Sequence, residues 1–188
     1  MLPATPEQRH RVVAASFGDL VAGVTDWSAP APVPDWTARD VVSHLVDWFT
    51  GFLAAGGVGL EPGPAVDADP VAAWRRHTSQ VQALLDGPSA TAEFTHPQVG
   101  TMPLVVAVDN FYTADVFMHS WDLARASGQD IALDEDQCAA MLAGMAQMEE
   151  MLRGSGQYGP AIAVPDHASA QDRLMGFIGR DPAWRPKE

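Results

Sequence analysis

The sequence is poor in cysteine, in basic residues and in long apolar runs, and each shortage excludes a class of protein. The single cysteine, Cys138, leaves no partner for an internal disulfide and rules out a zinc site built from cysteines. Eleven Lys and Arg face 24 Asp and Glu, and the net charge of −13 disfavours nucleic acid or an anionic membrane as a partner. No apolar run reaches the ~18 residues of a membrane span. The first residues also lack the basic and apolar regions of a signal peptide, so we expect a cytoplasmic protein.

Several common catalytic motifs are missing as well. The sequence has no Gly-x-Ser-x-Gly elbow, no phosphate-binding loop and no dinucleotide fingerprint. The glycines of "GGVGLEPG" (56–63) lack a flanking strand and helix, which indicates a flexible connector. What the sequence does have is 47% hydrophobic residues in a chain of 188, enough for the core of one domain.

Apolar residues recur at helical spacing in segments that are separated by connectors rich in Pro and Gly. A short extended piece is expected at "AEFTH" (92–96), and strand signals are otherwise sparse. The pattern predicts an all-α bundle. The expected helices cover about 6–24, 37–55, 71–85, 103–127 and 134–153, with a short one at about 169–178.

The helix expected at 103–127 carries ionisable residues on its apolar side. A helix turns by about 100° per residue, so Asp115, His119 and Asp122 lie at about 20°, 60° and 0° from Leu104. Burying these groups is costly unless something compensates their charge. One explanation is a metal ion held by Asp115 and His119, which are adjacent at i and i+4. The other is a buried hydrogen-bonded pair, with Asp122 tied to a neighbouring Arg or Trp.

His44 strengthens the metal hypothesis, because it lies at the edge of the apolar stripe of the helix expected at 37–55. Metal sites in bundle cores are often built from facing helices. The remaining histidines are weaker candidates. His10 and His77 stand beside arginines and are expected on solvated faces, whereas His96 and His167 are expected in loops.

Two stretches resemble the paired signatures of a known family. "DWTARDVVSHLVDW" (35–48) and "DVFMHSWDLARASG" (115–128) are similar to the mycothiol-dependent maleylpyruvate isomerase N-terminal domain, a branch of the DinB-like metalloproteins. The ending "YGPAIAVPDHASAQDRLMGFIGRDPAW" (158–184) resembles the tail of an actinobacterial subgroup of mostly uncharacterised members. The likeness extends over nearly the whole chain.

The resemblance implies a four-helix up-down-down-up bundle over residues 1–155 and a C-terminal extension, 156–188, with one short helix packed on it. It also implies a divalent metal held by His44, Asp115 and His119, with Asp122 as the residue that orients a ligand. Zinc is favoured, and nickel, iron or manganese are alternatives. The family usually has Glu where this chain has Asp115, which is one methylene shorter. The full isomerases also carry a further C-terminal domain, so we do not expect isomerisation of maleylpyruvate itself.

The leading functional hypothesis is a metal-dependent enzyme that uses a low-molecular-weight thiol, mycothiol if the resemblance holds, on an electrophilic small molecule. Such a protein would have thiol S-transferase or isomerase-like activity. The alternatives are a non-catalytic metal- or ligand-binding module and a metal-dependent hydrolase. Four methionines, Met141, Met145, Met148 and Met151, are explained mainly by core packing, with a homodimer contact as the alternative.

Overall fold

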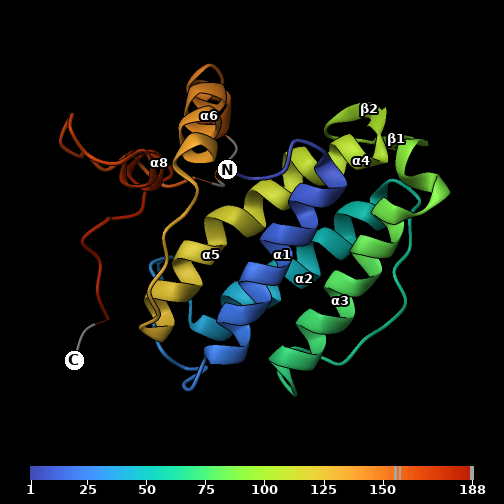
Figure 1. The fold of residues 1–188 in the computed structure, drawn as a ribbon, viewed down its shortest axis with the longest axis horizontal. Coiled ribbons are helices and arrows are strands. Elements are labelled where there is room, and N and C mark those ends of the chain that lie inside the picture. The colour runs from blue at the N-terminus through green and yellow to red at the C-terminus, as the bar shows by residue number, and fades with distance from the viewer. Residues whose placement is uncertain (155, 157, 187–188) are drawn as a thin grey trace.

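The structure is a computed structural model that describes residues 1–154, 156 and 158–186. These residues are mostly helical and include one small two-stranded sheet, so the all-α expectation is confirmed at that level (Figure 1). The predicted boundary at residue 155 lies outside the described residues. The elements are α1 (Pro6–Gly23), α2 (Ala38–Ala55), α3 (Pro70–Asp86), a 3₁₀ turn η1 (Pro88–Thr91), β1 (Glu93–His96), β2 (Gly100–Pro103), α4 (Leu104–Ala107), η2 (Val108–Thr113), α5 (Ala114–Ser127), α6 (Glu135–Ala146), α7 (Glu149–Gly154) and α8 (Ala170–Phe177).

Local sequence signals explain where these helices begin and end. At α2, Thr37 and Asp40 form a reciprocal capping box that satisfies two free backbone donors. Asp69 caps α3, whose first residue is proline, and Asp134 caps α6. Helix α5 ends at Gly128, which adopts a left-handed conformation with φ of 67°.

Helices α1, α2, α3 and α5 enclose the hydrophobic core. Helix α1 packs against α3 and α5, and α2 packs against the same two helices, so the four lie side by side (Figure 1). The chain between α2 and α3 runs along the outside of the molecule (Figure 1). Helix α5 is central to this packing, since every residue from Val116 to Ala124 is buried. The largest fully buried side chains outside α5 include Phe17, Leu45, Phe49, Leu53, Phe94 and Tyr112.

Three local predictions need correction. The segment expected as one regular helix is helical from Leu104 to Ser127, but its middle part, η2, is π-helical. The helix expected at 134–153 is interrupted between α6 and α7, and Met148, predicted to point inward, is 48% exposed. The extended piece at 92–96 is confirmed as β1, but it pairs antiparallel with β2, which was not predicted.

Three histidines were placed wrongly. His96, expected in a loop, is the last residue of β1 and is 5% exposed. His10 and His77 were expected on solvated faces, yet they are 0% and 4% exposed inside the helical core. Both lie at helical spacing from buried residues of their own helices, such as Phe17 and Val81, and this periodicity outweighs their arginine neighbours. Burial lowers the pKa of each imidazole to about 4, so both are neutral at pH 7.

The C-terminal part forms a smaller layer beside the core helices. Helix α8 packs on α6, and in Figure 1 both lie to one side of the four core helices. Leu174, Met175 and Ile178 are buried there. None of the helices among the described residues combines the length and the apolarity needed to cross a membrane.

Candidate metal centre

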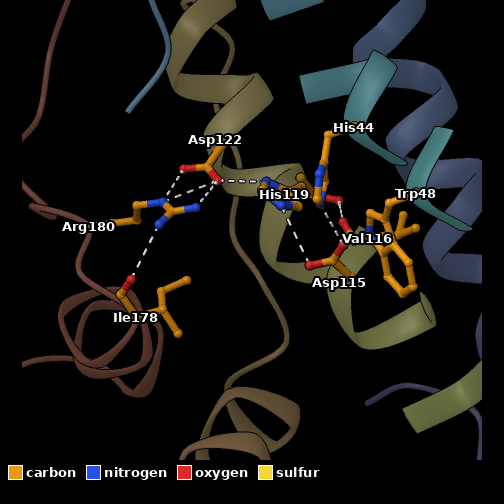
Figure 2. A network of polar contacts seen from close by, with 9 residues as sticks. His44, Trp48, Asp115, Val116, His119, Asp122, Ile178 and Arg180 are labelled. Carbon is orange, nitrogen blue, oxygen red and sulfur yellow. Dashed lines mark hydrogen bonds and ion pairs between the residues drawn. The ribbon is translucent and has the colours of Figure 1, made fainter. Parts of the chain in front are cut away.

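Residues from two helices converge at the site that the sequence predicted. Helix α2 contributes His44 and Trp48, and α5 contributes Asp115 and His119 (Figure 2). One donor atom from each of His44, Asp115 and His119 lies within 4.8 Å of the other two. The chain therefore brings together the three residues that were predicted as ligands, although they are up to 75 positions apart.

Asp115 is the centre of the cluster. Its Oδ2 atom accepts a hydrogen bond from Trp48 Nε1 at 2.7 Å and lies 3.1 Å from His44 Nε2. Its Oδ1 atom lies 3.5 Å from His119 Nε2. Both imidazoles therefore face the same carboxylate, and each presents its Nε2 atom to it (Figure 2).

His119 is held from its other side by Asp122. The Nδ1 atom of His119 lies 2.8 Å from Oδ2 of Asp122, which is a carboxylate with no exposed surface. Since a carboxylate can only accept, Nδ1 carries the proton and donates it. Arg180, from the chain beyond α8, in turn donates to both oxygens of Asp122 (Figure 2).

The charges of these groups shift one another's protonation. Burial would raise the pKa of Asp115, but the two imidazoles and the Trp48 indole outweigh it and lower this pKa. Burial would likewise lower the pKa of His119, but the carboxylates of Asp115 and Asp122 outweigh it and raise this pKa. Burial and, to a lesser degree, Asp115 raise the pKa of Tyr158.

Aromatic rings and an open pocket adjoin the cluster. The Trp36 ring stacks on His119 with centroids 5.7 Å apart and lies 4.9 Å from the His44 ring. A pocket of about 390 Å³ beside His44 is lined by Trp36, Trp48, Asp35, Asp40, Ser43 and Asp47. Asp35 adopts a left-handed conformation with φ of 64° in the turn that presents Trp36. A small molecule can therefore approach His44 from this side.

Sequence reasoning missed several residues of the site. Trp48 was assigned only to the apolar stripe, and Trp36 and Arg180 were assigned no role. The alternative hypothesis did anticipate an Arg or Trp tied to an aspartate. Arg180 contacts Asp122 as that hypothesis expected, whereas the indole of Trp48 contacts Asp115. The spacing of Trp48, four residues after His44 on the same helix, was the available signal.

One known protein family matches more than half of the chain. The profile of the mycothiol maleylpyruvate isomerase N-terminal domain matches residues 10–124, which include α2, α5 up to Ala124 and all three candidate ligands. This chain belongs to that family. The match to this family ends at residue 124, before α6, so Tyr158 and Arg180 lie outside the matched domain.

Two curated relatives match beyond the family domain. Both are described as uncharacterized proteins, from two strains of Mycobacterium tuberculosis. Each is 27% identical to this chain over 179 residues, which cover 93% of the chain and 97% of the relative. The similarity therefore includes the C-terminal part as well as the mycothiol maleylpyruvate isomerase N-terminal domain. No solved structure gives a significant match.

Proposed function

We propose that His44, Asp115 and His119 bind a divalent metal ion and that the protein uses a low-molecular-weight thiol at this site. The observation that carries the proposal is the orientation of His119. Because Nδ1 donates to Asp122, a neutral His119 turns the lone pair of Nε2 toward an oxygen of Asp115 at 3.5 Å. Two acceptors that face each other repel unless a proton or a cation lies between them.

The distances are also compatible with a shared metal ion. Donors bound at 2.0–2.2 Å around a tetrahedral zinc ion are about 3.3 Å apart. The separations of 3.1 and 3.5 Å between the Asp115 oxygens and the two imidazoles are close to that value. The shorter Asp115 therefore still reaches both histidines, which supports metal binding despite the Glu that is usual in the family. Zinc suits two imidazoles and one carboxylate best, with nickel, iron and manganese as alternatives.

A divalent ion with three protein ligands would supply Lewis acidity and would lower the pKa of a bound thiol. The chain's own residues would prepare the site for it. Trp48 holds one Asp115 oxygen, and Asp122 keeps the proton of His119 on Nδ1 so that Nε2 is free to bind. The pocket beside His44 would admit the thiol and its electrophilic partner. The family's association with mycothiol supports a thiol of that kind.

We also infer the DinB-like up-down-down-up arrangement for α1, α2, α3 and α5, with residues 156–188 as a C-terminal extension. The mutual packing of the four helices and the outer course of the chain between α2 and α3 support it. In that arrangement α2 and α5 are neighbours, as the metal centre requires.

Elemental analysis and a thiol assay test the proposal. Purified protein should carry about one equivalent of metal after reconstitution with zinc, and H44A should lose it, whereas the control H167A, at an exposed loop histidine, should not. Mass spectrometry should then detect thiol adducts of an electrophile panel only when mycothiol is added. Less than about a tenth of an equivalent of metal would contradict metal binding. Turnover without thiol would favour a hydrolase, and bound metal without any turnover would favour a binding module.

A further inference from the structure

We infer that Arg180 is a positioning residue of the metal centre, which acts through Asp122 on His119. This inference rests on the metal-binding function proposed above. Arg180 donates through Nε to Oδ1 of Asp122 at 3.0 Å and through Nη2 to Oδ2 at 3.1 Å. This two-point contact fixes the plane of the carboxylate, whose Oδ2 atom also accepts from His119 Nδ1 at 2.8 Å (Figure 2).

The end of α8 explains how Arg180 reaches a helix 58 residues earlier in the chain. Gly179 has a φ of 86° and reverses the chain directly after α8. The backbone N–H of Arg180 then donates to the carbonyl of Met175 at 2.8 Å, a bond typical of a glycine-terminated helix. A Cβ atom at position 179 would lie 3.0 Å from backbone atoms of Gly159 and Pro160. Both the conformation and the space therefore require glycine before Arg180.

The C-terminal segment is also anchored without Arg180. The guanidinium of Arg153 donates to the carbonyl of Phe177 at 2.6 Å and lies over its ring. The backbone N–H of Ile162 donates to the carbonyl of Gly176 at 2.8 Å, and Leu174 and Met175 are buried. Replacement of Arg180 should consequently release Asp122 and leave the path of the chain in place.

The contact matters because Asp122 has no exposed surface. Its side-chain partners among the described residues are His119 and Arg180. Without the guanidinium, the carboxylate would face the imidazole alone, could rotate, and would no longer hold the His119 proton on Nδ1. Loss of such an outer partner typically weakens metal binding by about 10–100-fold. The C-terminal segment thus contributes to the metal centre although it lies outside the matched family domain.

Zinc titration of the full chain tests the inference, with a chelator as competitor. We expect R180M to bind zinc about 10–100-fold more weakly than the parent and R180K to lie between them, since Lys keeps the charge but not the two-point contact. The control R173M replaces an exposed arginine of α8 and should bind zinc like the parent. Zinc affinity of R180M within about twofold of the parent would overturn the inference.

A second measurement does not depend on metal binding, so it tests the role of Arg180 separately from the proposed function. It also serves if a variant binds zinc weakly only because it folds poorly. Nitrogen-15 NMR of metal-free protein, at a pH where His119 is neutral, reports which ring nitrogen carries the proton. The parent should carry it on Nδ1, whereas R180M and R180K should shift it partly to Nε2. An unchanged proton position in both variants would refute the role of Arg180. If the parent binds no zinc, the proposed function fails, and the NMR result still decides whether Arg180 positions His119.

Discussion

The buried pair His10 and His77 should make the protein sensitive to mild acid, and the size of the effect follows from their burial. Each imidazole has a pKa of about 4 in the folded chain, compared with 6.5 when exposed to water. The unfolded chain therefore binds protons between pH 6.5 and 4 that the folded chain does not. The contribution of the two histidines to the free energy of unfolding is fully present above pH 6.5 and is lost as the pH drops through this window.

The magnitude can be worked out for His77. A gap of about 2.5 pH units corresponds to a loss of about 3 kcal/mol below pH 4, of which about 2 kcal/mol is lost by pH 5. If His10 loses a similar amount, the combined loss is a large part of the ~5–15 kcal/mol free energy of unfolding of an ordinary domain. The substitution H77F removes the titrating group and retains a ring among Phe49, Trp74 and Tyr112.

Urea denaturation followed by far-ultraviolet circular dichroism would measure the free energy of unfolding at several pH values. H77F can change this free energy at pH 7.5 through packing, and that difference should be treated as an offset. Between pH 7.5 and 5, the parent should lose about 2 kcal/mol more than H77F. The control H167Q replaces an exposed histidine and should follow the parent. If H77F and the parent lose the same free energy, the burial assigned to His77 is wrong.

Three further predictions concern the metal centre and its surroundings. W48F removes the 2.7 Å donor to Asp115 and should weaken zinc binding by about tenfold, measured by chelator competition. D115E restores the usual family residue and should still bind zinc, because the longer side chain can reach a metal held by the same histidines; loss of binding would show that the site is built for Asp. G179A should lower the free energy of unfolding by at least about 1–2 kcal/mol, since alanine disfavours a φ of 86° and its Cβ meets Gly159; unchanged stability in a denaturant titration would contradict that packing.

The helices were predictable because their signals are local. The capping box at Thr37, the proline after Asp69 and the glycine at 128 mark ends that the structure confirms within a few residues. The π-helical turn η2 was not predictable, because no single residue in it breaks the apolar period. The interruption between α6 and α7 has no proline or glycine to mark it either, since Gln147 and Met148 suit a helix.

The candidate metal centre was predictable to the extent that spacing determines it. Asp115 and His119 are one helical turn apart, so their proximity follows from the helix alone. His44 could be named as a candidate from its place at the edge of the apolar stripe, but its contact with α5 could not, since nothing local sets the packing of α2 against α5. Arg180 is 58 residues from its partner and depends on the packing of α8, which is a long-range property. His10 was misjudged because the arginines beside it in sequence point elsewhere on the helix.

The charges of the cluster bear on which fourth donor would complete the proposed metal centre. Arg180 balances Asp122, so with neutral imidazoles the uncompensated charge of the cluster is that of Asp115. A divalent ion on that carboxylate would leave one positive charge in a largely buried place, which is costly unless an anion neutralises it. A thiolate or hydroxide as the fourth donor satisfies this condition, and a neutral thiol or water does not. The charge balance therefore favours ionised donors. A thiol that displaces hydroxide should bind as thiolate, with its proton leaving in the displaced water, so thiol binding to zinc-loaded protein should release almost no net proton to a weakly buffered solution.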